Sequence, residues 1–243
     1  MEKIISIVTA TYNAEATIEK TLKSVKNNKN DFVEFIIIDG LSKDNTIEIC
    51  NRYDSIIDKK IIEKDKGIYD AENKGVRNAT GKYVYFLQAG DILENGIIHE
   101  IIEIIRANEY PDFVYGNVVW GGEGRIYNGR FSKVDLCRHN ICQQAIFYKK
   151  SKIIEYGYFN IKFNVLADYD MNISFFGDNN NSIVYTEKII SIYDEGYSGK
   201  NKDAYYGVLT RIKRFYEKLG MKYCLIYIAI ATYRKIKSEL INI

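Results

Sequence analysis

Short apolar segments alternate with helix-like segments through the first 108 residues, and this alternation limits the possible folds more than any other feature. The apolar segments run nearly unbroken, as in strands that are buried on both faces. Strands of this kind joined through helices favour a mainly parallel sheet with helices on both faces. We therefore predict an α/β fold. The predicted strands are 4–9, 35–39, 56–62 and 83–87, and the predicted helices are 15–27, 42–53 (with Ser42 or Asp44 as its cap), 67–78 and 97–107.

After residue 108 the pattern is weaker and predicts a mixture of helices and strands up to about residue 200. Residues 113–120 have the pattern of a strand, and 121–124 that of a hairpin or loop. No Pro- or Ser-rich linker interrupts the chain, so we expect one fused domain followed by a helical arm at 205–243. The arm carries eight Lys or Arg and two Glu, a balance of +6, which leaves −4 on the first 204 residues of a chain whose net charge is +2. A basic arm on an acidic body indicates an anionic partner, either a membrane surface or a nucleic acid.

Composition and missing motifs exclude several classes of protein. With 47% hydrophobic and 27% charged residues, the chain has the composition of a globular protein. Its four Cys show no paired metal-binding spacing, and its two His cannot complete a zinc site or a hydrolytic triad. No Gly-x-Gly-x-x-Gly follows the first strand and no P-loop motif occurs, which argues against dehydrogenases and P-loop enzymes. No secretory signal precedes the first strand, so we expect a reducing, cytoplasmic compartment.

Three polar residues end predicted parallel strands: Thr9, Asp39 and Asp91. Because ligands bind at the carboxyl ends of parallel strands, we expect all three along one ligand-binding edge. Gly67 opens the polar helix 67–78, whose first N–H groups are free to bind a diphosphate. For Asp39, which precedes Gly40, a simple turn is the alternative role.

The run Glu63-Lys-Asp-Lys-Gly-Ile-Tyr-Asp-Ala-Glu-Asn-Lys-Gly75 is followed by Ala79-Thr-Gly81 and Phe86-Leu-Gln-Ala-Gly-Asp91. These segments resemble, in order, the second half of the nucleotide-sugar-binding domain of family 2 glycosyltransferases. The resemblance covers roughly residues 4–175 and implies a GT-A-like fold with a nucleotide-diphosphate sugar, most commonly UDP-linked, as donor. It also implies a nucleotide-sugar-binding half at 1–108 and an acceptor-binding, catalytic half at 109–204. By this resemblance the donor would be bound by Thr9, Ala10, Tyr12, Asp39, Asp65, Gly67, Asp70, Asn73, Ala89 and Gly90.

The same resemblance places Asp91 at the metal-binding Asp of the family's DxD-type motif. It implies a Mn²⁺ or Mg²⁺ ion that bridges the diphosphate and stabilises the charge of the leaving group. The local sequence Gln88-Ala-Gly-Asp91 lacks the preceding acid of that motif, so metal dependence stays open.

The segment Leu166-Ala-Asp-Tyr-Asp170 resembles the one that carries the catalytic base, with Asp168 at the base position and Asp170 one turn on. Inverting sugar transfer needs a carboxylate that takes the proton of the attacking hydroxyl. Two acids at the start of a helix are the alternative, because the helix dipole favours them. At 141–147, where many relatives have His-Gln before a strand, Gln143 replaces the His and cannot titrate. Gln143, Gln144 and Asp170 would contact the acceptor or the donor sugar.

Together these features predict an inverting glycosyltransferase that acts on a glycan or polyprenyl-linked acceptor in bacterial surface polysaccharide synthesis. A catalytically silent nucleotide-sugar-binding protein on the same fold is the alternative. A nucleotidyltransferase would need a Gly-rich basic loop after the first strand, which is absent. The apolar run at 223–233 is too short to span a bilayer, so the arm either packs on the body or lies on an anionic membrane. We expect a cytoplasmic protein, peripheral on the inner face of the membrane, with no nucleic-acid partner.

Overall fold

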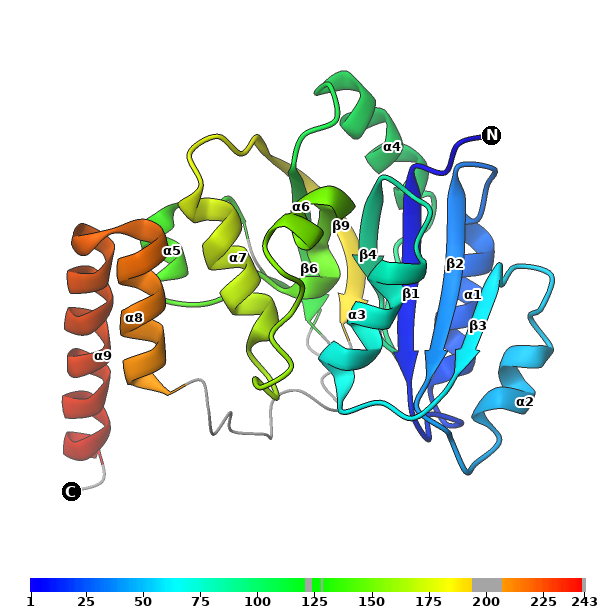
Figure 1. Ribbon diagram of the computed structural model, residues 1–243, viewed down its shortest axis with the longest axis horizontal. Helices are drawn as coiled ribbons and strands as arrows, with labels where there is room; N and C mark the ends of the chain where they lie inside the picture. Colours follow the sequence, from blue (N-terminus) through cyan, green and yellow to red (C-terminus); the bar gives the residue numbers. More distant parts are fainter. Residues whose placement is uncertain (121–123, 128, 194–206, 242–243) are drawn as a thin grey trace.

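A nine-stranded sheet forms the centre of the molecule, and helices cover both of its faces (Figure 1). This computed structural model describes residues 1–120, 124–127, 129–193 and 207–241. The strands are β1 (Ile5–Thr11), β2 (Val33–Asp39), β3 (Lys59–Ile62), β4 (Tyr83–Phe86), β5 (Ile92–Leu93), β6 (Phe113–Trp120), β7 (Arg125–Tyr127), β8 (Ile146–Lys149) and β9 (Ile183–Tyr193). The helices are α1 (Ile18–Asn28), α2 (Thr46–Asn51), α3 (Ile68–Asn78), α4 (Ile97–Ala107), α5 (Lys133–Leu136), the 3₁₀ turn η2 (Gln143–Ala145), α6 (Lys150–Glu155), α7 (Ala167–Gly177), α8 (Val208–Leu219) and α9 (Met221–Ile241).

The strand order is β3-β2-β1-β4-β8-β6-β9-β5, with β7 paired to β6. Strands β1 to β4 are mutually parallel, which confirms the predicted parallel sheet with α/β connections. The second half adds antiparallel pairs, because β8 runs against both β4 and β6. Strand β5 from the first half pairs with β9 from the second, so both halves share one sheet.

Alternate residues of the parallel strands face two separate apolar layers. Val8 and Ile36 face the layer that includes α3 and α7, whereas Ile7 and Ile37 face the layer that includes α1 and α4. Both layers exclude water, so each strand needs apolar side chains on both faces. This explains the unbroken apolar runs in the sequence.

Helix α3 is placed closely against β1, and two glycines make this possible. A Cβ on Gly75 would lie 2.3 Å from Cγ1 of Val8, so only glycine lets the helix approach this strand. Gly67, directly before the helix, has a φ of 117°, which favours glycine. The first turn of α3 is thereby fixed at the carboxyl end of β1.

Two predicted elements are markedly shorter in the structure: the strand 56–62, of which Lys59–Ile62 form β3, and the helix 42–53. Helix α2 is shorter than the predicted 42–53, and its N-cap is Asn45 and neither Ser42 nor Asp44. Residues 42–45 form a loop whose backbone is held by acidic side chains. Asp39 accepts a hydrogen bond from the backbone N–H of Ser42, and Asp44 accepts one from that of Thr46, the first residue of α2. The predicted hairpin or loop at 121–124 lies mostly outside the described residues.

Helices α8 and α9 form a hairpin at the end of the molecule opposite β3 (Figure 1). Phe215, Cys224 and Tyr227 of this hairpin are buried in the layer that includes α7. Arg214 of α8 makes a two-pronged ion pair with Asp170 of α7. The predicted arm is therefore helical and packs on the body. Within the part of the chain that the structure describes, no helix is both long and apolar enough to cross a membrane.

Candidate active site

A cavity of about 1070 Å³ opens beside the carboxyl ends of β1 and β4. Ligands bind at this edge in parallel sheets, and the volume suits a substrate larger than a single sugar. The lining comes from segments within 10–17, 65–71, 88–91, 140–144 and 161–168, together with Trp120, Tyr127 and Tyr193. Segments far apart in the sequence thus meet at one site.

Asp168, the predicted base, lines this cavity from the first turn of α7 and is 9% exposed. Its Oδ1 accepts a hydrogen bond from the hydroxyl of Tyr69 at 2.9 Å, and its Oδ2 accepts one from Nδ2 of Asn140 at 2.6 Å. Burial raises the pKa of Asp168 to about 6, while these two donors oppose the rise. A carboxyl group in this state is mostly ionised at neutral pH and still basic enough to take a proton.

The donors to Asp168 are themselves held by further hydrogen bonds. Oδ1 of Asn140 accepts from Nδ2 of Asn172 at 2.8 Å, and Oδ1 of Asn172 accepts from the hydroxyl of Tyr148 at 2.9 Å. The Tyr69 hydroxyl also lies 2.5 Å from the carbonyl oxygen of Val165. The sequence analysis missed Tyr69 and Asn140, although Tyr69 lies inside the run that carries the family resemblance.

Several predicted donor-binding residues line the cavity: Ala10, Tyr12, Asp65, Gly67, Asp70 and Ala89. Asp65 and Asp70 also shape the turn that leads into α3. Oδ1 of Asp65 accepts from the backbone N–H of Gly67 at 2.9 Å, and Oδ2 of Asp70 accepts from that of Lys66 at 3.0 Å. Tyr12 is 61% exposed, which leaves its ring available to stack on a ligand.

Thr9, Asp39 and Gly90 do not belong to the cavity lining. Thr9 is fully buried within β1, on the strand face opposite Ala10. Both carboxylate oxygens of Asp39 accept hydrogen bonds from Ser42, at 2.8 Å and 2.6 Å, as in the turn that was the alternative role. Gly90 donates its backbone N–H to Oγ1 of Thr21 at 2.8 Å.

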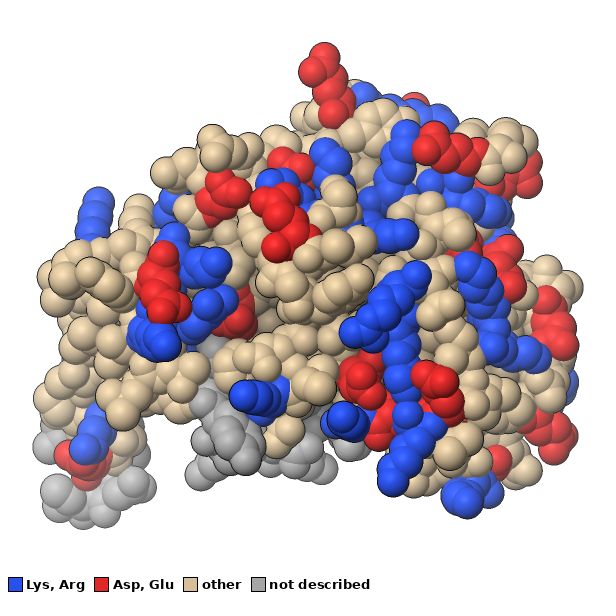
Figure 2. Space-filling model, in the orientation of Figure 1, with Lys and Arg blue, Asp and Glu red and all other residues tan. Residues whose placement is uncertain are grey.

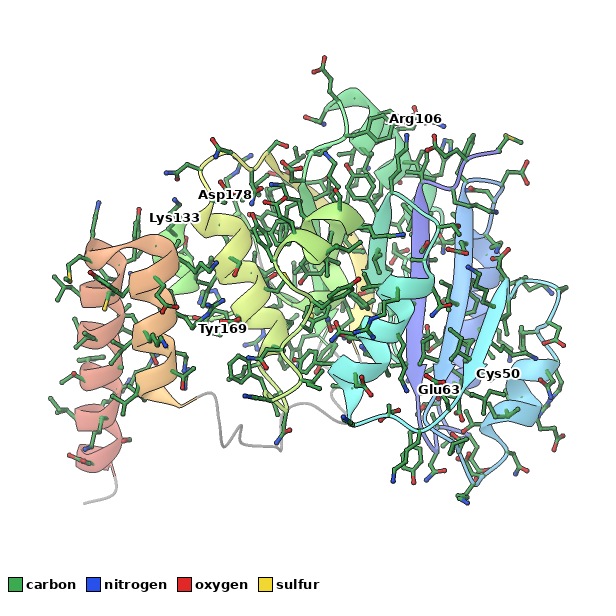
Figure 3. The ribbon with its side chains drawn as sticks, in the orientation of Figure 1. Cys50, Glu63, Arg106, Lys133, Tyr169 and Asp178 are labelled. Carbon is green, nitrogen blue, oxygen red and sulfur yellow. The ribbon has the colours of Figure 1, made fainter. Side chains whose placement is uncertain are left out.

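Asn73 and Asp170 also lie outside the lining, because each joins two elements of the fold. The Asn73 amide binds both the N–H and the carbonyl of Phe159. Asp170 pairs with Arg214. The predicted position of Asp170, one turn after Asp168, is wrong: residues that are two apart on a helix differ by about 200° in direction, so the two carboxylates point away from each other. Figure 3 labels Tyr169, between them on α7, which contacts Phe215 of α8.

Asp91, the predicted metal ligand, lines the cavity and is 1% exposed. It does not end a strand, since β4 ends at Phe86; it lies in the loop before β5 and its Oδ2 accepts from the backbone N–H of Gln88 at 3.3 Å. Among the described residues, no three His, Cys, Asp or Glu gather as metal ligands. A single carboxylate nevertheless suits Mg²⁺ or Mn²⁺, which take their remaining ligands from phosphate oxygens and water.

Gln143 and Gln144 both line the cavity, as predicted for residues that contact a sugar. Gln143 is hydrogen-bonded to Glu72 of α3, a fully buried residue that the sequence analysis did not single out. The two carboxylate oxygens of Glu72 accept hydrogen bonds from Nε2 of Gln88 at 2.7 Å and from Nε2 of Gln143 at 2.9 Å. Burial raises the pKa of Glu72 to about 8, while the two amide donors favour the ionised form. The sequence could have pointed to Glu72, because its spacing from Tyr69 and Val76 puts an acid on the buried face of α3.

A large cavity at the carboxyl edge of parallel strands, with the buried Asp168 and Asp91 both in its lining, suits an enzyme that moves a group between two substrates. Residues 6–169 match the family model described as Glycosyl transferase family 2. The chain belongs to this family of glycosyltransferases.

Curated relatives and solved structures agree with this assignment. A PGL/p-HBAD biosynthesis glycosyltransferase of Mycobacterium bovis is 33% identical over 195 residues, which are 78% of this chain and 76% of the relative. The poly(ribitol-phosphate) beta-N-acetylglucosaminyltransferase TarP of Staphylococcus aureus is 28% identical over 155 residues, or 61% of this chain and 47% of that protein.

The similar solved structures support the fold alone, because their sequence identity is low. S. aureus TarS 1-349 in complex with UDP has a TM-score of 0.69 at 16% identity, and the match covers 78% of this chain and 60% of that one. The mannosyltransferase PcManGT from Pyrobaculum calidifontis, in complex with GDP-Man and Mn²⁺, has a TM-score of 0.63 at 16% identity, with 96% and 65% covered. The expected GT-A-like fold is thereby confirmed.

Proposed function

We propose that this enzyme transfers a sugar from a UDP-linked donor to a hydroxyl group of a glycan or polyprenyl-linked acceptor, with inversion at the anomeric carbon, in bacterial surface polysaccharide synthesis. The observation that carries the proposal is Asp168, a buried carboxyl group with a pKa of about 6 that lines the cavity. Asp168 takes the proton of the acceptor hydroxyl as its oxygen bonds to the anomeric carbon. The bond from that carbon to the diphosphate oxygen breaks, and the nucleoside diphosphate leaves with the electron pair.

The division of the cavity follows from its lining. Residues 1–108 hold the nucleotide and diphosphate, through Tyr12, the turn at Asp65 and Gly67, and the free N–H groups of the first turn of α3. Residues 109–204 supply Asp168 and the aromatic side chains Trp120, Tyr127 and Tyr193, which suit the apolar face of an acceptor sugar.

Asp91 would hold a divalent cation together with the diphosphate. When bound, such a cation neutralises charge on the leaving diphosphate. Two residues of this chain already prepare the position: the Gln88 N–H orients the Asp91 carboxylate, and Ala89 leaves space beside it at the cavity wall.

The hairpin of α8 and α9 would place the active site at an anionic membrane that contains the acceptor lipid. One face of α9 packs on the body through Cys224 and Tyr227, while the apolar residues Met221, Leu225, Tyr233 and Ile236 are each more than half exposed. In the view of Figure 2 this end of the molecule is mostly uncharged, with Lys and Arg and a few Asp or Glu at its margins. Apolar side chains with basic neighbours (Lys222, Arg234, Lys235 and Lys237) suit a helix that lies in the lipid headgroup region.

Replacement of Asp168 tests the proposal. Asp168→Asn keeps the shape of the side chain and loses its basicity, so kcat should fall at least about a hundredfold while UDP affinity stays unchanged. Asp170→Asn is the matched control, because Asp170 is an acid on the same helix turned toward Arg214; it should lower stability and leave most of kcat. Full activity of Asp168→Asn would remove the base from this segment. Turnover of a labelled nucleotide sugar by the wild type separates the enzyme from a catalytically silent binding protein.

A further inference from the structure

Glu72 lies directly behind the cavity wall and is fully buried. It does not line the cavity, but Gln88 and Gln143, the two side chains hydrogen-bonded to it, both do. They come from different parts of the chain, the loop after β4 and the turn η2, so Glu72 joins two segments of the lining. Its hydrogen bonds reach the cavity wall through these two amides.

We propose that Glu72 is a positioning residue for the donor sugar: it binds the amide nitrogens of Gln88 and Gln143 and so turns both amide oxygens toward the cavity. The proposal rests on the proposed function and adds which part of the donor these oxygens recognise. An amide that directs its nitrogen to a carboxylate presents its carbonyl oxygen on the other side. Within the described parts of the chain, no group donates a hydrogen bond to either amide oxygen.

Two amide oxygens at one wall select the chemistry of the group they bind. Both accept hydrogen bonds, so they cannot bind phosphate oxygens, which are acceptors as well. They fit the hydroxyl groups of a hexose, or the N–H of an acetamido group beside one hydroxyl. These oxygens therefore suit the sugar of the donor and do not suit its diphosphate.

A carboxylate at position 72 is required because a neutral amide there cannot orient both neighbours. In Glu72→Gln, an NH₂ group replaces one of the two oxygens that accept from the glutamines, so the glutamine bound at that position loses its acceptor. This glutamine must rotate, which replaces one acceptor on the cavity wall by an NH₂ donor. A sugar hydroxyl then loses its partner, and the site acquires a donor without an acceptor.

The experiment compares the affinities of UDP and of a UDP-sugar by calorimetry, at a pH above the Glu72 pKa of about 8. The UDP-sugar is the one that the wild type turns over fastest in a panel. In Glu72→Gln, affinity for the UDP-sugar should fall about ten- to a hundredfold and affinity for UDP should stay unchanged. An unchanged ratio of the two affinities would overturn the proposal. A wild type that binds the sugar donor and UDP equally would also overturn it, and a wild type that binds neither would overturn the proposed function with it.

Two further variants separate positioning from a general loss of structure. In the double variant Glu72→Gln with Gln143→Glu, the amide at 72 again pairs with a carboxylate, so the sugar preference should return in part. Glu34→Gln is the matched control, since Glu34 is 3% exposed and binds Ser6 and Thr80 away from the cavity. It should lower stability and leave the affinity ratio unchanged. If the double variant shows no recovery, Glu72 does not act by orienting the amides.

The pH dependence of sugar binding supplies an independent measurement. Below its pKa, Glu72 carries a proton that it must donate to one of the amide oxygens, so the sugar preference should weaken as pH falls through about 8. The titratable groups that face Glu72 are Asp168 on α7, Tyr69 on α3 and Tyr148 on β8. Asp168 titrates near 6 and both tyrosines well above 10, so a change centred near 8 belongs to Glu72. A preference that does not vary with pH in the wild type would contradict the proposal.

Discussion

Single carboxyl groups in this site acquire different properties from their surroundings. Asp168 is buried and accepts two side-chain hydrogen bonds. Asp91 is buried and accepts a hydrogen bond from a backbone N–H, while both oxygens of Asp39 accept hydrogen bonds from Ser42. The residue type is the same in all three, but Asp39 lies outside the cavity, whereas Asp168 lines it with a pKa raised to about 6. Chemical role at this scale depends on burial and on hydrogen-bond partners.

The pH dependence of the reaction follows from the pKa of Asp168. The carboxyl group accepts a proton only when ionised, so kcat should rise with pH through about 6 and then level off. Initial rates at saturating donor concentration over a range of pH would measure this. The residual activity of Asp168→Asn should lack the step, and a step of the same size in that variant would assign it to another group.

Metal dependence tests Asp91. Asp91→Asn keeps the size of the side chain but removes the charge that would hold the cation, so Mn²⁺ should no longer strengthen UDP binding. Calorimetric titration of UDP with and without Mn²⁺ measures the effect. Asp65→Asn, which replaces another acid of the cavity lining, should retain the Mn²⁺ effect. Unchanged Mn²⁺ dependence in Asp91→Asn would exclude this residue as the ligand.

At the scale of elements, Asn73 shows how a residue of the family motif can serve the fold. Its amide binds the N–H and the carbonyl of Phe159 at 3.0 and 2.8 Å and so attaches α3 to the segment that precedes α7. Asn73→Ala leaves two buried backbone groups without partners and should cost about 2 kcal/mol of unfolding free energy, with UDP affinity nearly unchanged. Urea denaturation measures the loss. Asn78→Ala, which removes an exposed bond within α3, should cost much less. A normal melting curve together with a loss of UDP binding would show that Asn73 binds the donor and does not act mainly on stability.

The elements of the first half could be predicted because each carries its own signal. Buried strands are apolar throughout, and α4 has the bounds that its periodicity predicts, 97–107. The site was harder to predict, because it is formed by side chains that are far apart in the sequence. The hydrogen bonds from Tyr69 to Asp168 and from Gln143 to Glu72 depend on the tertiary fold, in which β8 lies between β4 and β6. Asp170 shows the same limit, since its partner Arg214 lies in the arm.

For the whole molecule, the charge distribution and the α8–α9 hairpin predict where the enzyme works. The wild type should bind vesicles that contain anionic lipid, and this binding should fade as salt screens the basic side chains. Leu225→Glu combined with Ile236→Glu should abolish flotation with such vesicles while turnover of a water-soluble acceptor remains. Ile154→Glu, which charges an exposed apolar residue on α6, should float as the wild type does. Equal flotation of the double variant would exclude the hairpin as the docking surface.

The burial of Phe215, Cys224 and Tyr227 sets a lower limit on the length of a fragment that can fold. The ring of Phe215 stacks on that of Tyr227 and contacts that of Tyr169, the residue that follows Asp168. A polypeptide that stopped at residue 204 would leave this apolar side of α7 facing water. The segment that matches the family model is therefore shorter than the unit that must be synthesised for the enzyme to reach its native state.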